Sequence, residues 1–338
     1  MRRGALLLVL SVSALLSSCD RGSRPEPASG PAPGPSTPTS DARPAGRAGG
    51  TIGFSALTLT NPFFKIIGDT LTREAEQHGF KVLVDDANRD VNTQSKHVDN
   101  YIARKVTAIV LNPVDRMAIG PAVKKANEAG IPVFTCDLEC VAEGVKIAGH
   151  VGTDNFQGGR LAGQAMIEVL GEAGGKVLIL HFKQANSCVM RVNGFREAVD
   201  AHNKNRQSGI IDIVAELEGG GLKDPAFRAA SDALQAHPDL AGIFAINDPS
   251  ALGAWTALKQ ANKADQVKLI GFDGQIDGKQ AIKEGKIHAD PIQFPEKMAA
   301  VTMQNILKYQ DGEEFQQYQL IPTELYRKAD AEKDPALK

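Results

Sequence analysis

Two adjacent aromatic residues and an amide lie where a strand-like run gives way to a helix-like one. Phe63 and Phe64 follow Asn61 and Pro62, just after the apolar run of residues 51–57. Sugars present C–H faces that stack on rings and hydroxyl groups that need donors and acceptors, so this corner suits a polyol. An ordinary helix start, with an asparagine cap, a first-turn proline and core packing of Phe63, explains much of the same pattern.

Polar residues recur just after the predicted strands, at the edge where open α/β sheets bind ligands. They are Asn61, Asn112, Asp137, Asn247, Asp273 and Gln293. These amides and carboxylates can each take two hydroxyl groups, and the set contains no His, Lys or Ser triad. For each residue alone a turn-forming role is the simpler interpretation. Together, beside two aromatic rings, they predict a site for a neutral polyol.

The elements that must position these residues alternate along the chain after Thr51. Apolar, often β-branched runs predict strands at 51–57, 80–84, 108–111, 131–135, 146–150, 176–182, 210–215, 241–246, 267–272 and 287–291. Longer stretches with apolar residues three or four apart predict helices between many of them. Such alternation favours parallel sheets covered by helices on both faces. Ten strands exceed one comfortable sheet and the pattern breaks near residues 149–154, so we expect two doubly wound α/β domains.

The N-terminal end predicts export. Arg2 and Arg3 precede an apolar stretch that ends at small residues before Cys19, which resembles a lipoprotein signal peptide with its lipobox over residues 1–19. Cys19 would then carry the lipid, and an aspartate at position 20 resembles the signal that retains a lipoprotein on the inner membrane. Residues 20–50 are rich in Pro and Gly without apolar periodicity, which predicts a disordered tether.

The composition excludes several classes of protein. The 338 residues include 38 Lys and Arg against 40 Asp and Glu, a net charge of -2, which gives no sign of a nucleic-acid partner. No apolar run after the leader is long enough to span a membrane. After Cys19 only Cys136, Cys140 and Cys188 remain, too few for a disulfide framework or a zinc site, although a local Cys136–Cys140 disulfide stays open. We expect no metal and no cofactor.

In order and combination, the body of the chain resembles the periplasmic sugar-binding proteins of the ribose-binding family, from Thr51 to about Leu325. The segments that carry the resemblance are Asn61-Pro62-Phe63-Phe64, Leu111-Asn112-Pro113, Asp137, Thr153-Asp154-Asn155, Arg191 before Gly194-Phe195, Ala236-His237-Pro238-Asp239, Asn247-Asp248, Gly271-Phe272-Asp273-Gly274 and Gln293. The resemblance implies a type I periplasmic binding protein fold with two lobes and a hinge crossed several times. The lobes would comprise residues 51–152 with about 294–322, and residues 153–293 with about 323–330.

The resemblance also implies a role for each site residue. From the first lobe, Phe63 and Phe64 would flank the sugar, while Asn61, Asn112 and Asp137 take its hydroxyls. Arg191, Asn247, Asp273 and Gln293 would approach from the second lobe and the hinge, and the arginine fork could bridge ring oxygen and hydroxyls.

Two positions depart from the pattern of ribose binders. Leu138 stands where they carry an arginine, and Gly221 stands where they carry an aromatic residue. A lost charged donor and a lost stacking wall make ribose a poor fit. We expect a larger or differently oriented monosaccharide, or a cyclic polyol.

The sequence therefore predicts a lipid-anchored periplasmic substrate-binding protein, monomeric, that captures a monosaccharide for an ABC-type permease. The alternative is a sugar sensor that presents its closed form to a membrane kinase or chemoreceptor. An enzyme acting on sugars is disfavoured, because we expect hydroxyls and Arg191 to keep both Asp137 and Asp273 charged, whereas a glycosidase needs one raised acid.

Overall fold

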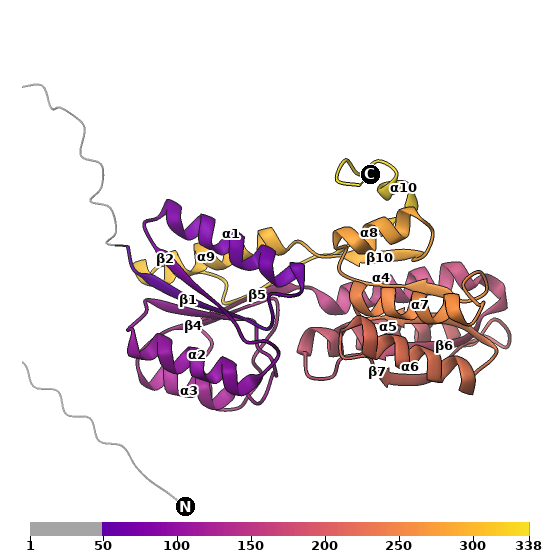
Figure 1. Ribbon diagram of the computed structural model, residues 1–338, viewed down its shortest axis with the longest axis horizontal. Coiled ribbons are helices and arrows are strands. Elements are labelled where there is room, and N and C mark those ends of the chain that lie inside the picture. The colour runs from indigo at the N-terminus through magenta and orange to yellow at the C-terminus, as the bar shows by residue number, and fades with distance from the viewer. Residues whose placement is uncertain (1–48, 338) are drawn as a thin grey trace, which may run out of the picture. The chain divides into compact units, whose positions relative to one another are not determined.

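The computed structural model describes residues 49–337 of the chain. The predicted leader, its Cys19 and nearly all of the predicted tether over residues 20–50 lie outside the described residues. The rest is built around two six-stranded sheets, each the centre of one lobe (Figure 1). The predicted fold class, α/β with two parallel-sheet domains, is confirmed.

The first sheet has the strand order β11-β5-β4-β3-β1-β2, and every neighbouring pair is parallel. Its strands are β1 (Thr51–Ala56), β2 (Lys81–Asp86), β3 (Ala108–Leu111), β4 (Val133–Cys136), β5 (Gly149–Thr153) and β11 (Tyr318–Ile321). The carboxyl ends of parallel strands meet at one edge of a sheet, so the residues that follow β1, β2 and β4 are brought together.

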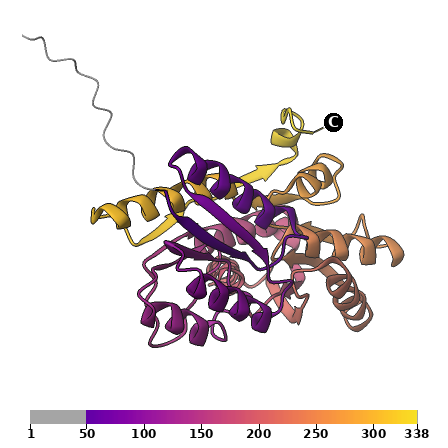
Figure 2. The ribbon, with the colours of Figure 1, turned by 60° about the vertical axis from the view of Figure 1, so that its left-hand side comes forward.

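Helices cover both faces of this sheet. They are α1 (Pro62–Gln77), α2 (Val91–Ala103), α3 (Gly120–Glu128) and α9 (Pro295–Asp311). The C-terminal part of the chain returns to this lobe, because α9 packs beside α1, as Figure 2 shows for the yellow and indigo helices. Helix α1 ends at a glycine, which can adopt the left-handed backbone that a helix end requires. Gly79 has φ +78° and donates its amide to the carbonyl of Glu76.

The second sheet has the order β12-β10-β9-β8-β6-β7, parallel throughout except where β12 pairs antiparallel with β10. Its strands are β6 (Gly175–His181), β7 (Ile211–Glu218), β8 (Leu240–Ala245), β9 (Lys268–Ile270), β10 (Ala289–Ile292) and β12 (Glu324–Arg327). Its helices are α4 (Asn155–Leu170), α5 (Asn186–Asn203), α6 (Lys223–Ala236), α7 (Asp248–Gln260), α8 (Ile276–Lys283) and α10 (Lys328–Ala331), with a single 3-10 turn at Gly171–Ala173. Helices α4 and α5 pack together, and so do α6 and α7.

The chain passes between the two sheets three times, after β5, after β10 and after β11. Each of the ten predicted strands overlaps an observed one, but the fifth lies about three residues later than predicted, so that Thr153 ends it. Strands β11 and β12 were not predicted. Both are short edge strands with exposed positions, so they lack the apolar run on which strand prediction depends.

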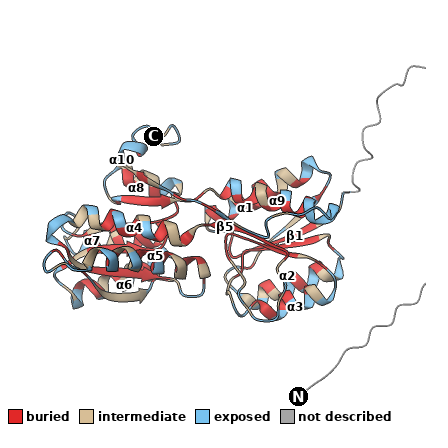
Figure 3. Cartoon of the chain, turned by 180° about the vertical axis from the view of Figure 1, so that it is seen from behind, coloured by how far each residue is buried: buried red, intermediate tan, exposed pale blue. Residues whose placement is uncertain are grey.

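Burial follows the layers of both lobes. The central strands of both sheets are largely buried, as the red ribbon in Figure 3 shows, while the edge strands and the outer helix faces are partly exposed. In the second lobe the rings of Phe195 on α5 and Phe244 on β8 stack with centroids 4.5 Å apart. Among residues 49–337 no helix is both long and apolar enough to cross a membrane.

Candidate ligand-binding site

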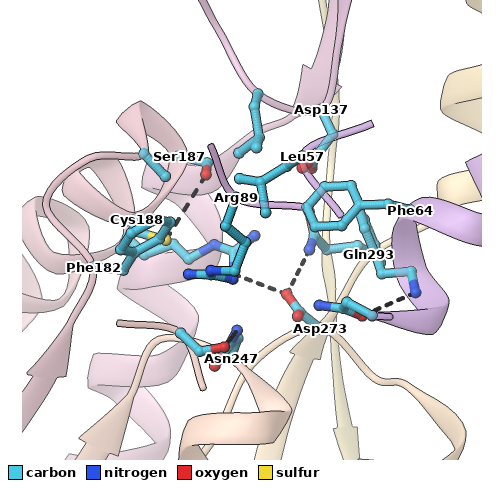
Figure 4. Close-up of a pocket in the computed structure, with 16 residues that line it drawn as sticks. Leu57, Phe64, Arg89, Asp137, Phe182, Ser187, Cys188, Asn247, Asp273 and Gln293 are labelled. Atoms are coloured by element: carbon cyan, nitrogen blue, oxygen red, sulfur yellow. Dashed lines mark hydrogen bonds and ion pairs between the residues drawn. The ribbon is translucent and has the colours of Figure 1, made fainter. Parts of the chain in front are cut away.

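A pocket of about 430 Å³ lies between the two lobes at the carboxyl ends of their strands (Figure 4). Sixteen residues line it: Leu57, Asn61, Phe63, Phe64, Arg89, Asp137, Leu138, Phe182, Ala185, Ser187, Cys188, Arg191, Gly221, Asn247, Asp273 and Gln293. The pocket therefore combines aromatic and aliphatic walls with two carboxyls, two guanidinium groups and three amides.

Eight of the nine residues selected from the sequence line this one pocket, and they come from both lobes. The ninth, Asn112, is fully buried just after β3 and lies outside the lining. Its side-chain amide donates to the carbonyl of Cys136, at 2.5 Å, on the strand that leads to Asp137. Asn112 is thus placed to hold the end of β4 rather than to touch a ligand in the pocket.

The corner at Asn61 in the first lobe is both an ordinary helix start and part of the pocket wall. Asn61 caps α1, with its Oδ1 accepting the amide of Phe63 at 3.0 Å, and Pro62 occupies the first turn. The rings of Phe63 and Phe64 meet edge to face, with centroids 5.5 Å apart. Both rings are largely buried yet line the pocket, so they offer an apolar wall whose position is fixed by the helix start.

Asp137 is held just past β4 on a backbone that few residues adopt. Its φ is +62°, in the left-handed region, and its amide donates to the carbonyl of Val151 at 2.8 Å. The side chain is buried, and its Oδ1 has no hydrogen-bond partner within residues 49–337. A buried acceptor without a donor is unfavourable, so a hydroxyl group entering the pocket would restore what the fold leaves unsatisfied.

The second-lobe wall is an interlocked network around Arg191. Its Nη1 donates to Asp273 Oδ1 at 2.8 Å and to the carbonyl of Ile246 at 2.6 Å, while its Nε donates to Asn155 at 2.8 Å. The guanidinium also lies 3.8 Å from the ring centroid of Phe272. Arg191 and Asp273 are both almost fully buried, so this ion pair is held in a dry environment.

Gln293 links the network to the hinge. Its Nε2 donates to Asp273 Oδ1 at 2.6 Å, and its Oε1 accepts from the hydroxyl of Thr153 at 2.7 Å. Thr153 ends β5 at the first crossing between the sheets, and Gln293 follows β10 at the second. Asn247 completes the wall by capping α7 through Ser250 and donating to the carbonyl of Gly221 at 3.1 Å.

Burial changes the acid–base state of the two pocket carboxyls. Burial raises the pKa of Asp137 to about 7, with Arg191 lowering it and Asp273 raising it further. Burial also raises the pKa of Asp273, although Arg191 beside it opposes the shift. Without a ligand, desolvation therefore outweighs Arg191 at both carboxyls, whereas the expectation that both stay charged concerns a site that also holds sugar hydroxyls. Exclusion of an enzyme rests on the family instead.

Several lining residues are absent from the set predicted by sequence. Arg89 lies three residues after β2, and Phe182 directly follows β6. The rule that selects residues after strand ends would have found both, had it been applied beyond amides and acids. The two departures from the ribose pattern, Leu138 and Gly221, also line the pocket, so both form part of its wall.

Cys136, Cys140 and Cys188 are all free thiols, so the local disulfide between the first two does not form in this structure. Burial raises the pKa of the Cys188 thiol, which lines the pocket, to about 11. A thiol in this state is a weak nucleophile. No cluster of three metal-binding side chains occurs in the part of the chain that the structure describes.

The comparisons with known proteins agree with this geometry. A family model described as a periplasmic binding protein domain matches residues 52–314. The ribose import binding protein of Salmonella typhimurium is 35% identical over 267 residues, covering 79% of this chain and 86% of that protein.

Solved structures resemble the chain over most of its length. A solute binding protein from Actinobacillus succinogenes with bound D-allose has a TM-score of 0.76 and 29% identity, and the match covers 84% of this chain and 99% of that one. One from Agrobacterium vitis with bound D-fucose has a TM-score of 0.76 and 30% identity, covering 85% and 98%. The chain therefore belongs to the periplasmic binding protein family, in which its relatives are substrate-binding proteins of ABC importers and not enzymes.

Proposed function

We propose that this protein is a lipid-anchored receptor that captures a monosaccharide, either a pentose, a hexose or a cyclic polyol, between its lobes and delivers it to an ABC-type permease. The observation that carries the proposal is the pocket in which eight residues selected from the sequence meet, with a buried Asp137 oxygen that has no donor among residues 49–337. Relatives that bind ribose, D-allose and D-fucose support the class of ligand.

Each wall has a distinct role in this proposal. Phe63 and Phe64 stack on the C–H face of the ring, and Asp137 accepts hydroxyl groups. From the second lobe Arg191 and Asp273 meet the opposite edge, with Gln293 at the hinge. Because the sugar would contact both lobes at once, it stabilises the closed arrangement that a permease recognises.

A thermal-shift screen of the chain from Asp20 to Lys338 tests the ligand class. The panel is D-ribose, D-arabinose, D-allose, D-fucose, myo-inositol, D-glucuronate and D-galacturonate. A ligand at a hundred times its dissociation constant adds about 2.7 kcal/mol of stability, enough to move the melting temperature by degrees. A shift with one or more neutral members of the panel supports the proposal. A folded protein that responds to no member of the panel contradicts it.

The lipid anchor is tested on the full-length chain in a bacterial host. Cys19 would carry the lipid, so labelled palmitate should enter the wild-type protein and fractionation should place it with membranes. Cys19→Ala should take up no label. A wild-type protein that takes up no label would contradict the anchor while leaving sugar capture intact.

A further inference from the structure

Arg89 is a pocket residue that reaches from one lobe to the other. It lies on the loop between β2 and α2, where Asn88 and Arg89 both adopt left-handed backbone angles, φ +48° and +60°. Hydrogen bonds hold this loop: the amide of Asn88 donates to Asp86 Oδ1 at 2.7 Å, and that of Arg89 donates to the carbonyl of Leu57 at 2.9 Å. Such a conformation is unfavourable outside glycine and persists where the surroundings fix it.

The Arg89 side chain ends on the second lobe. Its Nη2 donates to the carbonyl of Gly220 at 2.5 Å, and its guanidinium carbon lies 5.1 Å from the ring centroid of Phe182. Arg89 and Phe182 both line the pocket, as Figure 4 shows. The contact therefore joins the lobes at the ligand site itself.

The charge of Arg89 differs from that of Arg191 in one respect. Arg191 is paired with Asp273, whereas within residues 49–337 Arg89 forms no ion pair, although the charge of Glu218 attracts it from farther away. Its two direct partners are neutral, a carbonyl and a ring. A guanidinium carries five N–H donors, and the Gly220 carbonyl occupies one, so a group that lines the pocket keeps donors that this bond does not use.

Two neighbouring positions of the pocket wall do not supply a hydrogen-bond donor or a ring from their own side chains. Leu138 offers no donor, and Gly221 carries no side chain. Gly221 has φ +63°, and a Cβ there would approach Asn247 Nδ2 to 3.2 Å, so a ring is disfavoured at that position. Phe182 and Arg89 place a ring and a guanidinium in the same pocket from other elements.

We propose that Arg89 is a specificity-determining residue of the proposed sugar site, donating to acceptor oxygens on the ligand while its bond to Gly220 holds the lobes together. The inference rests on the proposed function. Asp137 offers an unsatisfied acceptor on one side of the pocket and Arg89 offers only donors. The preferred ligand therefore presents a hydroxyl hydrogen toward Asp137 and an acceptor oxygen toward Arg89, either a ring or hydroxyl oxygen or a carboxylate.

The test compares Arg89→Met, Arg89→Lys and the control Arg104→Met, which removes an exposed arginine of the same lobe. Isothermal titration of each with the seven-compound panel gives dissociation constants, and small-angle scattering gives the compaction on ligand addition. For the panel member that wild-type protein binds best, Arg89→Met should weaken binding about 10- to 150-fold, the usual value of a charged hydrogen bond. Arg89→Lys should recover part of the loss, and Arg104→Met should match wild type.

The outcomes separate this inference from the function on which it rests. Wild-type binding with an unchanged Arg89→Met affinity overturns the role of Arg89 and leaves sugar capture standing. No binding of any panel member by wild type overturns both. A uronate preference that vanishes in Arg89→Met identifies a carboxylate as the partner of Arg89, whereas a neutral-sugar preference identifies a ring or hydroxyl oxygen.

Discussion

The two lobes contribute to the pocket in opposite states of completeness. In the second lobe Arg191 donates to Asp273 and to the carbonyl of Ile246 without any ligand. Asn247 likewise donates to the carbonyl of Gly221. In the first lobe, by contrast, Asp137 Oδ1 is a buried acceptor at the pocket with no donor within residues 49–337. One half of the site is preorganised by its own network, and the other half is completed only by what enters the pocket.

This difference separates stability from recognition. Removing a member of a satisfied buried network leaves its partners unpaired, so the fold bears the loss. Removing an unsatisfied acceptor relieves the folded state of the cost of burying an unpaired polar group, but it also removes a contact to the ligand. Substitutions in the second lobe should therefore act first on unfolding, and those in the first lobe first on binding.

The largest effect is expected at Arg191. Arg191→Met would leave Asp273 buried without its cation, so the free energy of unfolding should fall by about 3–5 kcal/mol. Urea denaturation followed by circular dichroism measures the loss. A double variant, Arg191→Met with Asp273→Asn, should recover much of it, and a fully stable single variant would break the distinction between the lobes.

Asp137 should show the reverse behaviour. Asp137→Ala should weaken binding of the preferred panel sugar by about 2–4 kcal/mol, some 30- to 1000-fold, because the acceptor for its hydroxyls is lost. The melting temperature without sugar should stay the same or rise at pH 8. An unchanged affinity in calorimetry would remove Asp137 from the site.

The pH dependence of binding sharpens the same point. Burial raises the pKa of Asp137 to about 7, and hydroxyl donors favour the charged form. Affinity for a neutral sugar should therefore rise about tenfold from pH 6 to pH 8, as the charged fraction grows from about a tenth to nine-tenths. The sign for stability is opposite: without sugar the folded state binds the extra proton, so Asp137 lowers stability as pH rises from about 4 to 7. Titrations of Asp137→Asn should lack the tenfold rise in affinity and show a smaller fall in stability than wild type.

The smallest effect concerns an exception within the second lobe. Asp290 and Asp248 are buried together, and both oxygens of Asp290 lack a donor within residues 49–337. Burial raises the pKa of Asp290 to about 6, so the pair retains a proton at a pH where isolated carboxyls are charged. Asp290→Asn should raise the free energy of unfolding more at pH 8 than at pH 4, because the penalty of the raised pKa develops as pH rises from about 4 to about 6. Equal effects at both pH values would assign the change to packing.

Much of the site followed from one rule applied to the sequence. Residues just after parallel strands share an edge, and this alone brought Asn61, Asp137, Asn247 and Asp273 together. The rule says where a residue lies but not where its side chain points, which is why Asn112 bonds to Cys136 instead. The burial of Asn112 depends on contacts with neighbouring strands and helices, which the sequence of its own strand does not contain.

Two kinds of feature could not be predicted in this way. Protonation of Asp137 depends on the summed burial by both lobes, which the order of residues does not express. The reach of Arg89 across to Gly220 depends on how two separately folded lobes meet. The edge strands β11 and β12 were missed because their residues are half exposed and gain their pairing from distant segments.

The three crossings between the sheets bear on the entropy of capture. A single linker would let one lobe swivel in many directions, whereas three connections side by side restrict the motion toward rotation about one axis. The bond between Thr153 and Gln293 ties two of these connections to each other. A receptor with few open orientations loses little conformational entropy when it closes, so more of the contact energy with a sugar is available as affinity.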